Sequence, residues 1–296
     1  MRVFLTGATG FIGARILDQL VAAGHEVIGL TRSDAGARRL ALAGASAHLA
    51  MLEDPEGLAK GAEQADAVIH TAFDHDFSNF AANCEKDRKV IAALGAVLKG
   101  SSRPLLITSG VGMGDPGAGA PAREDVFDIH HRNPRIASEL EGTEQLQAGV
   151  NLGVVRLPQV HDTVKQGLIT PYIAMAREKG VVAYVEDGEN RWSAGHVDDV
   201  AKVYVLALER AEPGARYHAV AEEGVSARAI AEAVATGLKL PAVSLSKAEA
   251  ATHFGWFGLF AAMDLRASSA LTQEKLGWVP RGPSLLDDLR EMNYAV

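Results

Sequence analysis

The sequence predicts an α/β protein with a doubly wound parallel sheet and a smaller α/β lobe toward the C-terminus. A glycine-rich turn between an apolar strand and a helix, short apolar strands that alternate with helical segments, and a length of 296 residues indicate this architecture. We expect residues 1–160 to form the sheet domain and helix 196–210 to pack back onto it. Residues 161–195 and 211–296 are expected to form the lobe.

The glycine turn is the strongest signal. An apolar strand at residues 3–5 leads into the turn, and a helix begins at Phe11. Gly7 permits a tight turn, Gly10 lets the backbone approach a pyrophosphate, and Gly13 lets helix and strand pack closely. The pyrophosphate would rest on free N–H groups at the positive end of the helix dipole. Because strand, turn and helix follow in this order, the turn predicts a dinucleotide site rather than a plain connection.

Composition narrows the class of protein. The net charge is −8 and mean hydropathy is +0.04, with no basic block and no apolar stretch of membrane-spanning length. We therefore expect neither nucleic acid nor a membrane as a partner. Cys84 is the only cysteine, so no intrachain disulfide can form, and this favours a cytoplasmic location. We expect no metal site, and we expect Cys84 to be a buried small side chain.

The end of the second strand carries a cofactor signal. This strand is expected at residues 26–30 and runs into Thr31-Arg32-Ser33-Asp34. In dinucleotide folds an acidic residue here binds the ribose of NAD, whereas an arginine accommodates the extra phosphate of NADP. Arg32 therefore favours NADP, with NAD as the alternative, unless Arg32 is only a solvated surface charge. Ser33 and Asp34 suit the cap of the next helix.

Four further strands are expected in the sheet domain, at residues 46–52, 66–72, 104–108 and 151–156. Helical patterns lie between them, the longest at residues 77–98.

These motifs resemble those of the extended short-chain dehydrogenase/reductases, a family that includes nucleotide-sugar epimerases and dehydratases. Residues 6–13 match its Thr-Gly-x-x-Gly-x-x-Gly, and residues 66–72 match Asp-x-Val-x-His-x-Ala. Residues 196–201 and 276–280 are similar to its His-Val-x-Asp-Val-Ala and Leu-Gly-Trp-x-Pro. Residues 50–54 keep only the end of its Gly-Asp-Leu-x-Asp. The resemblance implies a Rossmann domain that binds NAD(P) and a C-terminal substrate lobe.

The resemblance also implies site residues. Ser109 matches the serine that hydrogen-bonds the substrate oxygen. Independently of the resemblance, residues 112–122 are rich in Gly, Pro and Ala and predict a long loop, either a lid or a binding loop. His70 is expected to be a packed residue. The cofactor contacts expected are Gly7, Thr9, Gly10, Phe11, Ile12, Gly13, Arg32, Ser33, Leu52, Thr71, Ala72, Ser109 and Pro158.

One departure from the family pattern bears on activity. Most members use a Tyr-x-x-x-Lys pair, in which the tyrosine exchanges a proton and the lysine lowers its pKa and binds the nicotinamide ribose. No such pair exists in this chain. Aligned on Ser138, the tyrosine position is Arg135 and the lysine position is Glu139. Arginine cannot exchange a proton near neutral pH, and glutamate reverses the charge expected beside the ribose.

Three hypotheses remain open from the sequence. His130 or His131 supplies the proton, and we name His131 as the catalytic candidate. Alternatively, Arg135 acts as an electrostatic clamp on a carbonyl or anionic substrate. In the third hypothesis the protein binds NADP without chemistry and reports redox state, as NmrA-like regulators do. A plain Arg135–Glu139 ion pair on an exposed helix is the structural alternative.

The lobe carries weaker signals for a small-molecule substrate, either a carbonyl compound or a nucleotide sugar. Arg191 and Trp192, in an expected turn, are candidates to hold a substrate phosphate and ring. His196 faces either the substrate cleft or the core, and Asp198 and Asp199 suit a helix start. Aromatic residues between 254 and 260 form the lobe core, an apolar pocket or a homodimer contact. We expect an atypical NADP-dependent oxidoreductase or epimerase-like enzyme, with the silent NADP-binding protein as the alternative.

Overall fold

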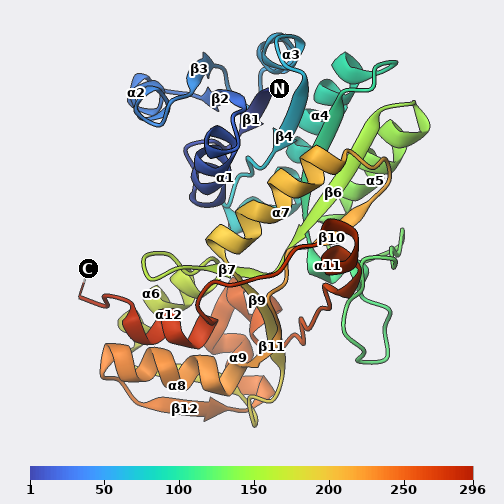
Figure 1. The fold of residues 1–296 in the computed structure, drawn as a ribbon. Coiled ribbons are helices and arrows are strands. Elements are labelled where there is room, and N and C mark those ends of the chain that lie inside the picture. The colour runs from blue at the N-terminus through green and yellow to red at the C-terminus, as the bar shows by residue number, and fades with distance from the viewer. Residues whose placement is uncertain (296) are drawn as a thin grey trace.

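A computed structural model describes residues 1–295 and contains one large parallel sheet (Figure 1). Its strand order is β10-β6-β5-β4-β1-β2-β3, which confirms the predicted doubly wound parallel sheet. From β1 the chain first adds strands on one side of the sheet, β2 and β3, and then on the other side, beginning with β4. The position between β1 and β4 is therefore the topological switch point, where such sheets bind ligands. The strands are β1 Arg2–Thr6, β2 Glu26–Thr31, β3 Ser46–Leu49, β4 Ala67–His70, β5 Pro104–Gly110, β6 Asn151–Leu157 and β10 Arg216–His218.

Helices cover both faces of this sheet because successive strand residues point to opposite sides. Val3 and Leu5 pack into one apolar cluster with α1 and α7, whereas Phe4 packs into another with α3 and α4. In Figure 1, α7 lies beside α1 although about 180 residues separate them, and the two helices are in contact. The helices are α1 Phe11–Ala22, α2 Asp34–Leu42, α3 Pro55–Glu63, α4 Phe80–Leu98, α5 Ile136–Gln147 and α7 Val197–Arg210.

The smaller lobe, at the bottom of Figure 1, has two small sheets, β11-β9-β7 and β12-β8. Its core contains Tyr172, Trp192, Phe254 and Phe257. Its strands are β7 Gln159–His161, β8 Val182–Val185, β9 Arg191–His196, β11 Glu222–Ser226 and β12 Ala242–Leu245. The remaining helices are α6 Ile169–Lys179, α8 Ala227–Leu238, α9 Lys247–Phe254, α10 Gly258–Ala261, α11 Ala270–Leu276 and α12 Leu285–Glu291.

Several boundaries differ from those expected. β10 pairs with β6 in the large sheet, although its segment was expected in the lobe. β3 ends at Leu49, so Leu52 lies beyond it, and β5 continues to Gly110, so Ser109 lies inside the strand. β9 begins at Arg191, so Arg191 and Trp192 lie in a strand rather than in a turn.

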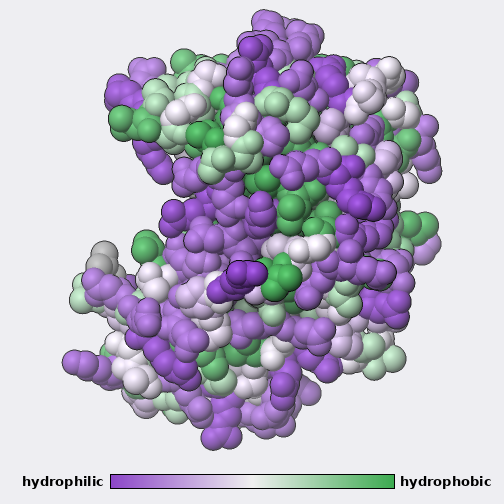
Figure 2. All heavy atoms as spheres, in the orientation of Figure 1, coloured by the Kyte–Doolittle hydropathy of each residue, from purple (hydrophilic) through white to green (hydrophobic). Residues whose placement is uncertain are grey.

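Most of the face seen in Figure 2 is hydrophilic, and hydrophobic residues gather in a small patch near its centre, over the region of α7. Among residues 1–295, no helix combines the length and the apolar character needed to cross a membrane.

Candidate functional site

The glycine turn joins β1 to α1 at the switch point of the sheet. Gly7 has a φ of +73°, a backbone conformation that favours glycine, and its carbonyl accepts the N–H of Gly10 at 2.8 Å. A Cβ on Gly13 would collide with that same carbonyl oxygen. Gly10 precedes the first turn of α1, and no side chain within residues 1–295 caps this helix. The N–H groups of the first turn are therefore available, and the turn fits a dinucleotide pyrophosphate.

The end of β4 lies directly against this turn. A Cβ on Gly7 would come within 2.6 Å of Thr71 Oγ1 and 2.8 Å of the Ala72 nitrogen. The Thr6 hydroxyl accepts the backbone N–H groups of Thr71 and Ala72, both at 3.2 Å. The structure thus brings the predicted cofactor residues of the two segments together, with Thr9, Phe11 and Ile12 in the turn and the start of α1.

The three residues expected at the adenosine end lie beyond β2 and β3. Arg32 is exposed, and within residues 1–295 its side chain forms no ion pair. Ser33 caps α2, because its hydroxyl accepts the Gly36 N–H at 3.1 Å. Leu52 is half-buried and packs against the core beneath α3. An exposed, unpaired arginine at this point has the freedom to meet a ribose phosphate.

Ser109 stands out by its burial. It lies near the C-terminal end of β5 and is only 3% exposed, yet its hydroxyl has no hydrogen-bond partner among the residues that the structure describes. A buried unpaired hydroxyl is costly, and such groups are rare in folded proteins. Its place, at the ligand-binding edge of the sheet, suits a hydroxyl whose partner is a bound molecule.

Arg135 directly precedes α5, and three groups hold its guanidinium. Nη1 donates to Asp87 Oδ2 and to Ser138 Oγ, both at 2.6 Å, and Nη2 donates to the carbonyl of Thr108 at 2.8 Å. The ring of Phe73 stacks over the guanidinium, with 4.2 Å from Cζ to the ring centroid. Two of its five N–H groups, on Nε and Nη2, have no partner within residues 1–295. The side chain is 13% exposed, so these groups remain reachable.

Asp87 links Arg135 back to the glycine turn. Its Oδ1 accepts from His70 Nε2 at 2.9 Å, and His70 Nδ1 lies 2.7 Å from the Thr6 hydroxyl. Burial opposes ionisation of Asp87, but the charge of Arg135 and the bond from His70 hold the pKa of its carboxyl well below the usual range. His70 is 1% exposed and forms part of this chain of hydrogen bonds. Asp87 is not in any motif of the sequence, so sequence reasoning missed it.

Comparison with known proteins identifies the family. Residues 3–221 match the NAD dependent epimerase/dehydratase family. The chain belongs to this family. It is 41% identical to an uncharacterized protein of Schizosaccharomyces pombe, over 99% of this chain and 100% of that protein. It is 37% identical to an uncharacterized protein of Saccharomyces cerevisiae, over the full length of both.

Two less similar proteins are named for an activity. Vestitone reductase of Medicago sativa is 26% identical over 73% of this chain and 76% of its own length. The crystal structure of a dTDP-glucose 4,6-dehydratase from Streptomyces venezuelae, with NAD bound, covers 99% of this chain and 96% of that one. Its TM-score is 0.78 at 18% identity, so this likeness concerns the fold.

Glu139, at the lysine position of the family pair, lies in a buried ion cluster. Arg156 grips it with Nε and Nη2, both at 2.8 Å, and Arg216 Nε adds a third contact at 2.9 Å. Burial opposes the charge of Glu139, yet these two arginines keep its pKa below the usual range. The structural alternative, an Arg135–Glu139 ion pair, is wrong, because each residue pairs elsewhere. The expected reversal of charge is also offset, since two cations face this carboxylate.

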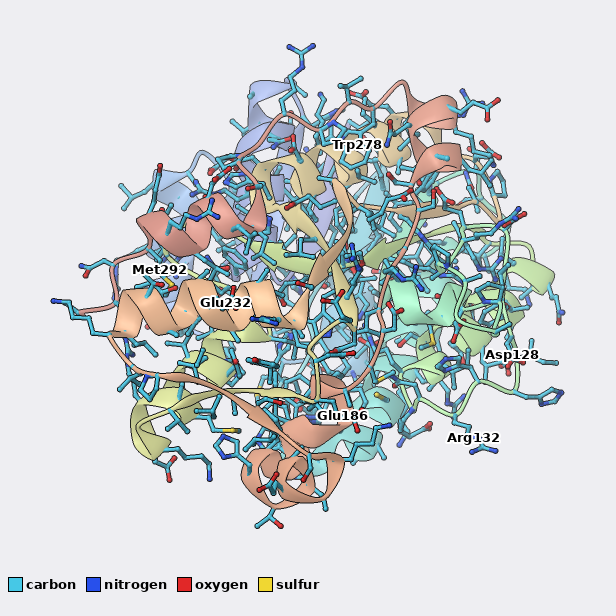
Figure 3. All side chains as sticks on the ribbon, turned by 90° about the horizontal axis from the view of Figure 1, so that it is seen from below. Asp128, Arg132, Glu186, Glu232, Trp278 and Met292 are labelled. Atoms are coloured by element: carbon cyan, nitrogen blue, oxygen red, sulfur yellow. The ribbon has the colours of Figure 1, made fainter. Side chains whose placement is uncertain are left out.

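The two candidate histidines lie on the loop before α5, not in the Arg135 network. His130 is exposed, and His131 is half-buried with its Nδ1 accepting the Asn133 N–H at 3.1 Å. His131 lines an open hollow of about 360 Å³ together with residues 115–117 and 126–128. In Figure 3 their neighbours Asp128 and Arg132 lie at the outer edge of the molecule. No hydrogen bond within residues 1–295 joins His131 to Arg135 or Ser109.

A lysine missed by sequence reasoning lies over the start of α1. The chain passes the half-buried Pro158 between β6 and β7 and then forms the loop 162–168. Lys165 of this loop places Nζ 5.6 Å from the Phe11 ring centroid. Its charge therefore adds to the positive helix end, where an anionic cofactor group would rest. No sequence signal marks Lys165, because about 150 residues separate it from the turn.

The lobe residues predicted to hold a nucleotide sugar, Arg191 and Trp192, contact other protein groups. Trp192 is 5% exposed in the lobe core and donates Nε1–H to the Met263 carbonyl at 3.2 Å. Arg191 lies 3.7 Å from a Glu189 carboxylate oxygen. The buried position of Trp192 therefore corrects its assignment as a substrate-ring contact.

His196 and the two aspartates that follow have structural contacts. His196 Nδ1 caps α7 by accepting the Asp198 N–H at 3.3 Å. Asp199 accepts the backbone N–H groups of Arg281 and Gly282. Within residues 1–295, no group of three or more His, Cys, Asp or Glu side chains is arranged to hold a metal ion.

Proposed function

We propose that this chain binds NADP(H) and reduces the carbonyl group of a small molecule. The observation that carries the proposal is the buried, unpartnered hydroxyl of Ser109, close in the chain to Thr108, whose carbonyl holds the Arg135 guanidinium. A hydroxyl donor and a guanidinium at the ligand edge of the sheet suit a carbonyl oxygen that becomes negatively charged during reduction.

The cofactor would be held by the glycine turn, the end of β4 and the end of β2. Gly7, Gly10 and Gly13 bring backbone N–H groups to the pyrophosphate, and Lys165 adds a positive charge over the same helix end. Arg32, exposed and without an ion-pair partner in residues 1–295, would meet the 2′-phosphate of NADP. Pro158 would contact the nicotinamide end through its backbone.

The chain's own residues divide the remaining work. Bound NADPH supplies a hydride for the carbonyl carbon. Ser109 would donate a hydrogen bond to the carbonyl oxygen, and the Nε–H and Nη2–H groups of Arg135 would stabilise its developing charge. The oxygen then takes a proton, for which we propose His131, on the loop before α5, as the donor, acting through water rather than by direct contact.

One observation favours a second candidate function. Arg135 and Glu139, which replace the tyrosine and lysine of the family pair, are both held in internal ion pairs. This arrangement also suits a protein that binds NADP without turnover and reports redox state to a partner. Epimerase-like action on a nucleotide sugar has less support, because Trp192 lies in the lobe core and Arg191 pairs with Glu189.

A titration with NADPH and NADH, read by fluorescence, tests the cofactor. We expect NADPH to bind about tenfold more tightly, the effect of one charge-assisted hydrogen bond to the extra phosphate. Arg32→Asp should remove this preference, while Arg38→Asp, an exposed arginine on α2, should leave it unchanged. Binding of neither nucleotide would overturn the proposal.

A carbonyl panel added to the NADPH complex separates the two candidate functions. Oxidation of NADPH by any aldehyde or ketone, with loss of that activity in Ser109→Ala, supports the reductase. Tight NADPH binding with no turnover across aromatic, aliphatic and sugar carbonyls would instead support the silent protein.

A further inference from the structure

Aromatic rings from the sheet domain and from the lobe meet beside Arg135. Phe77, in the segment after β4, stacks on Trp256 of the lobe, with ring centroids 4.8 Å apart and planes 6° from parallel. Phe260 of α10 approaches the same Phe77 edge-on, at 5.9 Å and 74°. We call Phe73, Phe77, Phe80, Trp256 and Phe260 the aromatic bridge.

The bridge begins at the candidate site. Phe73 stacks over the Arg135 guanidinium at 4.2 Å and contacts Phe80 edge-on, with centroids 6.2 Å apart. Phe80 lies 5.5 Å from Phe77, which reaches the lobe through Trp256. A continuous run of apolar rings therefore leads from the guanidinium to the lobe.

Trp256 differs from the other lobe aromatics. Its neighbours Phe254 and Phe257 are each 2% exposed in the lobe core, whereas Trp256 is 40% exposed. The indole N–H groups of Trp192 and Trp278 both donate to carbonyl oxygens, but that of Trp256 has no partner within residues 1–295. Trp256 packs on Phe77, Phe257 and Phe260, yet part of its indole stays exposed. A partly exposed indole at a domain junction is typical of a binding surface.

Two cations next to the bridge, Lys86 and Arg135, are paired with carboxylates. Lys86 lies on α4, in the chain after Phe80, and contacts Glu53 at 2.7 Å and Asp74 at 3.0 Å. Arg135 is paired with Asp87 beneath Phe73. A diphosphate would need unpaired cations at this wall, whereas a planar apolar ring needs only the faces of other rings.

We propose that the aromatic bridge is the substrate wall of the site, and that the substrate is an aromatic or conjugated carbonyl compound whose ring stacks on Trp256. This inference rests on the proposed carbonyl reduction and narrows its substrate class. The substrate ring takes the place of Phe77 on the indole face, and the carbonyl group points along the bridge toward Arg135 and Ser109. The displaced Phe77 and the other rings then exclude water from the reacting oxygen.

Steady-state kinetics with 2-naphthaldehyde and butanal, both with NADPH, test the role of Trp256. Trp256→Ala should raise KM for 2-naphthaldehyde about tenfold, within the range of a lost apolar pocket contact, while kcat changes little. KM for butanal should stay the same, because butanal has no ring to stack. Trp256→Phe should restore most of the affinity, and Val279→Ala, at a residue 63% exposed and outside the bridge, serves as the control.

Calorimetry on the NADP⁺-saturated protein separates this inference from the proposed function, because no hydride is then available. One outcome is that 2-naphthaldehyde binds and its binding weakens in Trp256→Ala, while no carbonyl oxidises NADPH. This outcome supports the aromatic bridge as a binding wall and overturns the proposed carbonyl reduction. If Trp256→Ala changes KM equally for both aldehydes, the aromatic bridge is not the substrate wall, and the proposed carbonyl reduction stands. Binding of UDP-glucose in preference to 2-naphthaldehyde, insensitive to Trp256→Ala, also overturns the bridge. Thermal unfolding of each variant verifies that it is folded.

Discussion

Arg135 Nη1 lies 2.6 Å from Asp87 Oδ2, and the two side chains form an ion pair that is almost closed to solvent. The family motif places a proton-exchanging tyrosine at the position of Arg135. Here a permanent cation stands there, and α4 supplies the carboxylate that balances it. Asp87 also accepts from His70, so the pair joins α5, α4 and β4. The guanidinium therefore has a fixed position, which a hydrogen-bond donor to a substrate oxygen requires.

Asp87→Asn should destabilise the protein. The amide keeps the shape of the side chain but leaves the Arg135 cation without its counter-charge, and breaking such a buried pair costs about 3 kcal/mol. Urea unfolding followed by circular dichroism measures the loss. Asp18→Asn, at an exposed position on α1, should change the free energy of unfolding by less than about 0.5 kcal/mol. Equal losses in both variants would contradict the role of the pair.

The same pair predicts how stability depends on pH. The Arg135 charge and the His70 bond outweigh burial and lower the pKa of folded Asp87, whereas an unfolded aspartate titrates near about 3.9. A depressed folded pKa stabilises fully above the unfolded pKa, and this stabilisation is lost as pH falls. The difference between wild type and Asp87→Asn should therefore be constant from about pH 7 to pH 5 and shrink below about pH 4. A difference that stayed constant to about pH 3 would exclude a charged Asp87 as its source.

Restoring the family lysine should fail. Glu139→Lys would place a third cation against Arg156, which is fully buried, and Arg216. We expect a loss of more than about 3 kcal/mol in the free energy of unfolding, because the arginines lose the carboxylate that they share. Glu144→Lys, exposed on the same helix, is the matched control. A stable Glu139→Lys protein would show that this ion cluster is not needed for the fold.

Local patterns predicted the sheet domain well. The glycine turn, the short apolar strands and the helices between them are set by neighbouring residues, and the observed strand order follows from their alternation. The three strands β7, β9 and β11 were missed or misplaced, because each is short and pairs with strands far along the chain. Their register depends on tertiary packing rather than on local pattern.

The hydrogen-bond partners of Arg135 could not be predicted from neighbouring residues in the sequence. Arg135 and Asp87 are 48 residues apart, and Thr108 is 27 residues from Arg135. Position in the motif identified Arg135 as unusual, but only the fold brings Asp87 to it. The stack of Phe77 on Trp256 likewise joins segments about 180 residues apart. Sequence patterns therefore located single unusual residues, while their contacts follow from the arrangement of whole elements.

Gly13→Ala should weaken cofactor binding. A Cβ there would collide with the Gly7 carbonyl oxygen, so α1 would move away from the turn. Such overpacking costs about 1–3 kcal/mol, and we expect the Kd for NADPH to rise at least about tenfold in the same variant. Gly258→Ala is the control, since a Cβ at Gly258 meets only an ordinary contact at 3.7 Å. Unchanged NADPH affinity in Gly13→Ala would argue against the turn as the pyrophosphate site.

Ser109→Ala should reduce activity without reducing stability. The Ser109 hydroxyl is buried and has no partner among residues 1–295, so its removal takes no hydrogen bond from the fold and should leave the free energy of unfolding equal or slightly higher. If the hydroxyl donates to the substrate oxygen during reduction, its loss should lower kcat about 100-fold, as for other donors to a developing oxyanion. The Kd for NADPH should not change. Thr143→Ala provides a comparison, because the Thr143 hydroxyl donates to a backbone carbonyl on α5 at 2.8 Å. Lower stability with normal kcat in Ser109→Ala would assign the hydroxyl to packing. Lower kcat with unchanged stability supports the substrate as the partner of the hydroxyl.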